Sequence, residues 1–153
     1  MKWMPFETQE EPQIQFHSTN IQFQLADETL YLQWVEQILE VEKHKHAHIN
    51  YIFCDDAYLL EKNQEYLDHD TLTDIITFEY SAAPISGDIF ISIERVKENA
   101  QERNIAFEKE LSRVMAHGIL HLCGYGDKKE DEVLIMRAKE EDCIQLLEKK
   151  SFH

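Results

Sequence analysis

The sequence predicts an α+β fold in a single domain, with a mixed four-stranded sheet packed by about five helices. Three observations predict it. Segments with strand character are interspersed with longer segments of helical period, without the strict alternation of a parallel α/β sheet. A chain of 153 residues with 43% hydrophobic residues can bury one core and is too short for two comfortable domains. Only 4 Gly and 3 Pro occur, which argues against a turn-rich β-sandwich.

Five segments have the period or composition of β-strands. The first two alternate apolar and polar residues, as half-buried strands do. The third carries three apolar residues on one face, and the last two are short, apolar and separated by a loop with Pro84. In chain order the segments are 14–16, 21–23, 48–54, 74–78 and 88–92. They supply about four strands of one sheet, preceded by residues 1–12, which are expected to be poorly ordered.

Five further segments have the features of helices. The first follows the candidate N-cap Asp27 and carries one apolar stripe, formed by Leu30, Trp34, Ile38 and Val41. Asp55 and Asp56 cap the second, Gly124 ends the fourth, and the fifth is amphipathic. In chain order the segments are 28–43, 56–66, 92–104, 107–123 and 130–149.

Charge restricts the partners of the chain. Fifteen basic residues face 30 acidic ones, which gives a formal net charge of −15. A field of that sign repels nucleic acid and anionic membranes, so an RNA partner needs a local positive groove. The chain has no run of 18 apolar residues and no signal-peptide pattern, so we expect a cytoplasmic protein without a membrane span. Its three cysteines contain no CxxC pair and are expected to be buried thiols.

Most of the chemical information lies in segment 113–127. His117 and His121 are four residues apart, so on a helix they point the same way. The surrounding helix is apolar almost all round and is therefore expected to be buried, where two imidazoles need partners. Gly124 can end the helix, and Asp127, six residues after His121, is the natural third ligand of a metal ion. Spacing alone leaves a hydrogen-bonded core pair open as the alternative.

Two neighbouring residues limit the chemistry of this site. The zinc-protease motif H-E-x-x-H places its general base directly after the first His, and that position is Gly118 here. Glu110 lies on the same helical stripe as His117 and could approach the metal, but a solvated surface glutamate is the interpretation that we favour. No general acid or base can be named.

The segment His117–Tyr125 resembles the signature H-G-x-L-H-L-x-G-Y of the YbeY family of bacterial metal-dependent endoribonucleases. Segment 73–78 is similar to the family's T-D-V-L-S-F strand, and segment 87–89 to its G-D-I strand start. The resemblance extends over roughly residues 50–140. It implies a mixed sheet packed by helices, a zinc ion and a role in ribosome biogenesis, at the 3′ end of the 16S ribosomal RNA and in ribosome quality control.

Two positions depart from the family pattern. The family's first two ligands correspond to His117 and His121, but its third, normally a His, corresponds to Asp127. A carboxylate is still a zinc ligand, although its charge makes the metal a weaker Lewis acid and widens tolerance for manganese. Leu67 stands where the family commonly has an Arg, which removes a cation that would bind phosphate.

The best candidate for an RNA-facing surface is segment 92–116, which carries five basic and five acidic residues. Its candidate substrate-binding residues are Arg95, Arg103 and Arg113. A solvated helix with ion pairs between successive turns explains the same pattern.

The sequence thus predicts a zinc-dependent endoribonuclease that cuts single-stranded RNA and carries one Zn²⁺ per chain. Its expected partners are the 16S 3′ end and the ribosome or its small subunit, without a membrane or a small-molecule cofactor. Two alternatives stay open. One is a ribosome-associated metal-binding protein with weak or no catalysis, and the other is a metallopeptidase-like hydrolase.

Overall fold

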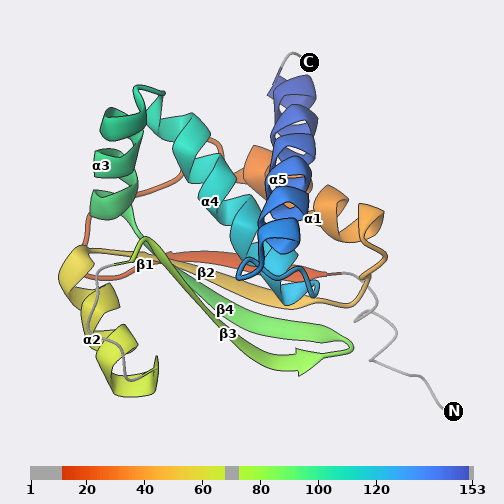
Figure 1. Ribbon diagram of the computed structural model, residues 1–153, viewed down its shortest axis with the longest axis horizontal. Helices are drawn as coiled ribbons and strands as arrows, with labels where there is room; N and C mark the ends of the chain where they lie inside the picture. The colour runs from red at the N-terminus through yellow and green to blue at the C-terminus, as the bar shows by residue number, and fades with distance from the viewer. Residues whose placement is uncertain (1–11, 68–72, 152–153) are drawn as a thin grey trace, which may run out of the picture.

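The computed structural model of the chain describes residues 12–67 and 73–151 (Figure 1). The predicted disorder of residues 1–12 therefore falls, apart from Pro12, outside the described residues. The described elements are β1 (Gln13–Ser18), α1 (Glu28–Val41), β2 (His48–Cys54), α2 (Asp56–Leu67), β3 (Ile75–Ala82), β4 (Ile85–Ser92), α3 (Ile93–Arg103), α4 (Phe107–Leu122) and α5 (Glu130–Ser151). The predicted α+β class is confirmed. None of the described helices is long and apolar enough to cross a bilayer.

The sheet is mixed, as predicted, with the strand order β1-β2-β4-β3. β1 pairs with β2 and β2 with β4 in parallel, whereas β3 pairs with β4 in antiparallel fashion. Parallel neighbours need a long crossover, and α1 supplies the one between β1 and β2. Only residues 83–84 separate β3 from β4, so these two strands form a hairpin.

Helices cover the two faces of the sheet unequally (Figure 1). α1, α4 and α5 lie on one face, where they enclose the main core with Ile49, Tyr51 and Phe53 of β2. On the opposite face α2 covers one end of the sheet through a smaller cluster made of Cys54, Leu59, Ile76 and Phe90. α4 is thus buried between the sheet and the neighbouring helices, which explains why it is apolar almost all round.

Helix starts follow the predicted side-chain caps. Asp27 Oδ1 accepts a hydrogen bond from the Leu30 amide at 3.1 Å, and Asp55 Oδ1 accepts one from the Tyr58 amide at 2.8 Å. These bonds satisfy amide groups that the first turn of a helix leaves unpaired. Both helices therefore begin where the sequence indicates.

Three details differ from prediction. Segment 21–23 forms no strand, because the chain turns at Asn20, whose φ is 60°; Ile21 and Phe23 instead pack against the core from a loop. Val41 is 57% exposed, since the buried stripe of α1 has already ended at Leu39. β3 and β4 are longer than predicted, because Pro84 lies in a tight connection rather than a longer loop, which lets pairing continue to Ala82 and Ile85.

Two contacts determine how α4 sits on the sheet. A Cβ atom at Gly118 would lie 2.9 Å from Ile89 Cγ2 and 3.0 Å from Ile75 Cδ1, so α4 approaches β3 and β4 closely at this point. One turn earlier, the buried Tyr51 hydroxyl donates a hydrogen bond to the Met115 carbonyl at 2.9 Å. The sheet therefore fixes both the height and the rotation of the helix that carries the two histidines.

We predict that Gly118→Leu lowers the free energy of unfolding by at least about 2 kcal/mol, because a close-packed interface cannot absorb the added atoms. Ala138→Leu adds comparable apolar bulk at an exposed position of α5 and should change stability by no more than about 0.5 kcal/mol. Urea denaturation followed by circular dichroism measures both. Equal stability of the two variants would show that α4 does not depend on this contact.

Candidate metal centre

α4 carries His117 and His121 on successive turns and then ends in a defined way. The Gly124 amide donates to the His121 carbonyl, and the Tyr125 amide donates to the Leu120 carbonyl, each at 3.0 Å. This pair of bonds is the Schellman motif, which requires a residue with positive φ just after the helix. Gly124 fulfils that requirement with φ of 108°. The chain thus turns sharply where the sequence predicts.

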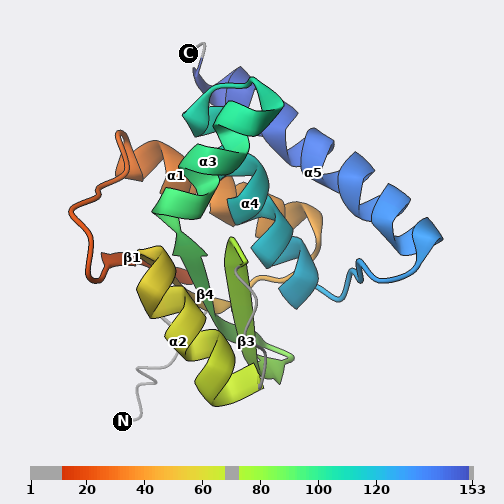
Figure 2. The same cartoon turned by 60° about the vertical axis from the view of Figure 1, so that its left-hand side comes forward.

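The loop after Gly124 is anchored on both sides, which places Asp127 beside α4. The Tyr125 hydroxyl donates to Glu42 Oε1 at 2.8 Å, which ties the start of the loop to the end of α1. At its end, Glu132 accepts the amides of Lys128 at 3.2 Å and Lys129 at 3.1 Å. Figure 2 shows this connection leaving the end of α4 before the chain enters α5.

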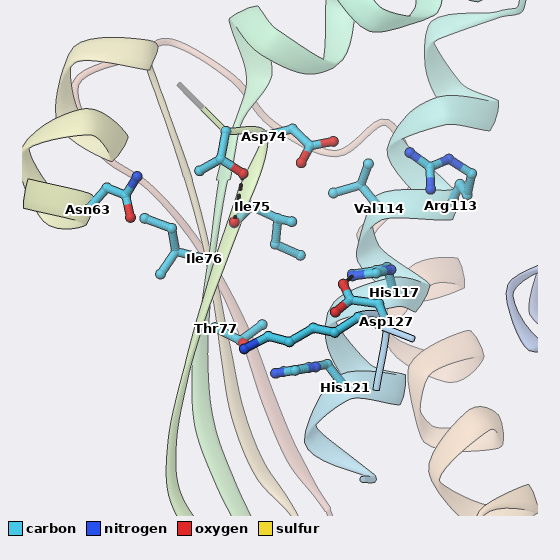
Figure 3. Close-up of a pocket in the computed structure, with 12 residues that line it drawn as sticks. Asn63, Asp74, Ile75, Ile76, Thr77, Arg113, Val114, His117, His121 and Asp127 are labelled. Atoms are coloured by element: carbon cyan, nitrogen blue, oxygen red, sulfur yellow. Dashed lines mark hydrogen bonds and ion pairs between the residues drawn. The ribbon is translucent and has the colours of Figure 1, made fainter. Parts of the chain in front are cut away.

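A pocket of about 730 Å³ opens between this end of α4 and β3. Figure 3 shows His117, His121 and Asp127 together on one side of it, with Ile76 and Thr77 opposite. Its lining residues are Asn63, Thr73, Asp74, Ile75, Ile76, Thr77, Arg113, Val114, His117, His121, Asp127 and Lys128. The three predicted metal ligands therefore share one cavity.

His117 lies between two carboxylates. Its Nδ1 is 2.7 Å from Glu140 Oε2 on α5, and its Nε2 is 3.2 Å from Asp127 Oδ2. Burial by itself lowers the pKa of His117, but the hydrogen bond to Glu140 and the charges of Glu140 and Asp127 outweigh it and raise the pKa above 6.5. The pocket thus favours a positive charge at this imidazole.

This arrangement fits a metal ion in one specific respect. When His117 is neutral and Nδ1 carries the proton, Nε2 presents a lone pair to the Asp127 carboxylate, and two acceptors face each other. Only a proton or another cation between them removes the repulsion. Imidazole nitrogen and carboxylate oxygen are both zinc ligands, and an imidazole that donates its other N–H to a carboxylate is the usual form of a metal-binding histidine.

His121 faces the same pocket but is exposed there, so the expectation that both imidazoles are buried is wrong for His121, which lies where α4 emerges beside the pocket. As they stand, no three His, Cys, Asp or Glu side chains within residues 12–67 and 73–151 are grouped closely enough to hold a metal ion. An exposed side chain changes rotamer within nanoseconds, so His121 and Asp127, which are both exposed, are the members of the set that can adjust. The ligand assignment of His117, His121 and Asp127 stays a prediction.

Glu110 is not the solvated surface residue that we expected from the sequence. Its side chain is fully buried and binds two arginines, Arg103 and Arg113. Arg113 donates to both carboxylate oxygens of Glu110, at 3.1 Å and 2.7 Å, and Arg103 also reaches both, at 3.1 Å and 2.9 Å. Arg113 continues to Glu140 Oε1 at 3.3 Å. Buried ion pairs therefore connect Glu110 to the carboxylate that binds His117.

The three arginines predicted to bind RNA lie in different surroundings. Arg113 lines the pocket but is paired with Glu110 and Glu140. Arg103 pairs with Glu110, while Arg95 pairs with Asp56 at 2.9 Å and Glu98 at 3.0 Å. Neither Arg95 nor Arg103 lines the pocket. Their RNA-binding role stays a prediction.

Leu67, at the family's Arg position, ends α2, and its side chain is outside the described part.

Two residues of the site, Glu140 and Lys128, were not predicted from the sequence. Glu140 is in contact with His117 although 23 positions separate them. A signal was present, because Glu140 falls four residues after Met136 and three before Cys143, within the apolar stripe of α5. An acid in such a stripe needs a buried partner. Lys128 gave no signal, since only the folded loop brings it to the pocket.

The cysteines take no part in this site. Cys54 and Cys143 are buried, and Cys123 is partly buried. Burial raises the pKa of each thiol to about 12, so they are protonated at neutral pH. The prediction of buried thiols is thus confirmed for two of them, and none lines the pocket.

We predict that His117 stabilises the metal-free protein more at low pH than at high pH. Because its pKa in the fold is raised above 6.5, its contribution is complete below that value and is lost as the pH rises through the raised pKa. The difference in Tm between the wild type and His117→Ala, measured in chelator, should be larger at about pH 6 than at about pH 9. His46→Ala, at an exposed position, is the control. A difference independent of pH would contradict the charged imidazole.

Comparison with known proteins assigns the chain to a family. The family model described as Endoribonuclease YbeY matches residues 13–148. The protein named Endoribonuclease YbeY in Flavobacterium psychrophilum is 53% identical over 131 residues, covering 85% of this chain and 94% of that protein. Its namesake in Cytophaga hutchinsonii is 48% identical, covering 89% and 96%. A solution structure from Thermotoga maritima covers 88% of both chains at 29% identity and a TM-score of 0.63. The chain therefore belongs to the YbeY endoribonuclease family.

Proposed function

We propose that the protein is a zinc-dependent endoribonuclease that cuts single-stranded RNA, with one Zn²⁺ held by His117, His121 and Asp127. The observation that carries this proposal is the 3.2 Å approach of His117 Nε2 to Asp127 Oδ2 inside the pocket, a contact that a proton or a metal ion between the two atoms stabilises. Three protein ligands leave a fourth position of zinc to water, as in catalytic rather than structural sites. When bound, zinc supplies a water acidified toward neutral pH and a Lewis acid for the phosphoryl oxygen.

The residues of the chain bind and orient the RNA around that centre. Among the described residues that line the pocket, Arg113 and Lys128 are the cations that can meet a phosphate. The charge of Arg113 is shared with Glu110 and Glu140, whereas none of the ion pairs within 4.0 Å among residues 12–67 and 73–151 includes Lys128. Lys128 is thus best placed to supply the positive charge that Leu67 does not.

The substrate that we propose is the 3′ end of 16S ribosomal RNA, with the ribosome or its small subunit as partner in maturation and quality control in the cytoplasm. Membership of the family supports this assignment. The pocket has the volume of a small-ligand site, which suits one strand rather than a duplex. A peptidase mechanism is disfavoured because Gly118, where a zinc peptidase has its glutamate base, packs against Ile89 and Ile75 and not toward the pocket.

We predict one divalent metal ion per chain, lost or weakened by ligand replacement. His121→Ala should reduce the metal content, and Asp127→Ala should weaken zinc binding by about tenfold or more, because one of three ligands is lost. Asp127→His should keep the metal. Elemental analysis and competition with a chromophoric chelator measure content and affinity.

The control for the metal experiment is Asp142→Ala, which removes an exposed acid of α5 distant in sequence from the loop. Equal metal content in the wild type and His121→Ala would overturn the assignment. Zinc affinity unchanged in Asp127→Ala would place the third ligand elsewhere.

We predict that Lys128→Ala raises KM for a single-stranded 16S 3′-end oligonucleotide several-fold. It should also reduce the slope of log K against log salt by about 0.7, the value for one phosphate contact on a single strand. Lys129→Ala is a matched control, since both amides bind Glu132 but only Lys128 lines the pocket. Equal effects of the two replacements would show that Lys128 makes no specific contact.

This pair of lysines is a cleaner test of RNA binding than the three arginines. Removing Arg103 and Arg113 would leave Glu110 charged and buried without a partner, at a cost of about 3–5 kcal/mol. RNA that is bound but not cut by the zinc-loaded wild type would favour the non-catalytic, ribosome-associated alternative.

A further inference from the structure

We propose that Glu140 is the positioning residue that makes His117 a metal ligand, because it takes the imidazole proton on Nδ1 and leaves the Nε2 lone pair to the pocket. The inference rests on the proposed metal centre and names a residue of α5 that has no place in the ligand set. Glu140 would not touch the substrate or the metal. It would act only through the protonation site and the orientation of the His117 ring.

Two carboxylates compete for the proton of the His117 ring. A neutral imidazole carries one N–H, and two acceptors compete for it, Glu140 at Nδ1 and Asp127 at Nε2. If Asp127 obtained the proton, Nε2 would have no lone pair for a metal. Glu140 is closer, at 2.7 Å against 3.2 Å, and its side chain is 5% exposed against 40% for Asp127. A hydrogen bond is stronger where water is excluded, so Glu140 holds the proton.

Glu140 is itself held in place by buried charge. Its Oε1 lies 3.3 Å from Arg113 Nη1, and Arg113 makes two hydrogen bonds to the fully buried Glu110. Arg103 closes the series at the end of α3. Moving the Glu140 carboxylate away from His117 would also take an ion-pair partner from Arg113, whose side chain is only 23% exposed. This series of ion pairs therefore holds the Glu140 carboxylate in place, and that carboxylate in turn orients the His117 ring.

The competing explanation is that Glu140 only holds α5 against α4. The structure allows this role to be distinguished from an effect on His117, because other contacts also hold α5. α5 is also docked by the Trp34 indole, which donates to the Cys143 carbonyl at 2.7 Å, and by Lys139, which binds Glu42 at 3.2 Å. Met136 and Leu147 add buried apolar contacts. Glu140→Gln, which keeps the side-chain volume, should therefore fold with α5 in place.

The first test reads the tautomer of His117 directly in the metal-free protein at alkaline pH, where the ring is neutral. Two-dimensional ¹H–¹⁵N spectra of ¹⁵N-histidine protein distinguish protonated from unprotonated ring nitrogens. The wild type should carry the proton on Nδ1, and Glu140→Gln should shift it toward Nε2, where Asp127 accepts it. An Nε2 proton in the wild type would overturn the proposal. This measurement uses the wild-type protein alone, so it does not depend on the folding of a variant.

The second test measures zinc affinity by chelator competition. Glu140→Gln should bind zinc about 10- to 100-fold more weakly, the usual effect of losing the carboxylate behind a metal-binding histidine. Glu141→Gln, an exposed neighbour with the same change of charge, should bind as the wild type does. A Glu140→Gln protein that is less stable but keeps the Nδ1 proton and the wild-type affinity would show a tether only. Unchanged affinity in His117→Ala would defeat the proposed metal centre itself, whatever the tautomer shows.

Discussion

The close seating of α4 on β3 and β4 is the constraint on which the rest of the structure depends. Gly118 allows the helix to approach until a single Cβ atom would overlap Ile89, and Tyr51 bonds the helix from the sheet below. With its height and rotation fixed, α4 can present His117 and His121 only to the pocket beside β3. The Schellman motif and Gly124 then return the chain within reach of the same pocket.

Buried ion pairs hold the Glu140 carboxylate against His117, and burying their charges costs free energy. Isolated charges in a core are expensive, and Glu110 is tolerable only because two arginines bind it. The same pairing commits Arg103 and Arg113 to internal partners in a chain with a net charge of −15. A chain of that charge repels phosphate, so a cation that lines the pocket, as Lys128 does, is the feature on which the proposed RNA binding depends.

Local patterns predicted most of the fold, because they record interactions within a few residues. The caps Asp27 and Asp55, the strand 48–54 and the end of α4 at Gly124 were all visible in the sequence. Segment 21–23 was misread because its alternation reflects packing of Ile21 and Phe23 against the core without any strand partner. Alternation of apolar and polar residues indicates which side chains are buried. It does not indicate whether the backbone is hydrogen-bonded to another strand.

The sequence by itself determined the α+β class, the buried helix with two histidines on one face, and a turn that returns Asp127 toward them. Only the tertiary structure decided which charges meet. Glu110 was expected in water and is in the core, and Glu140 lies against His117 from 23 positions away. The physical reason is that helical period places a residue on a face, whereas the partner of that face depends on how α3, α4 and α5 pack. Ion pairs between helices are therefore properties of the packed molecule, and local sequence carries little trace of them.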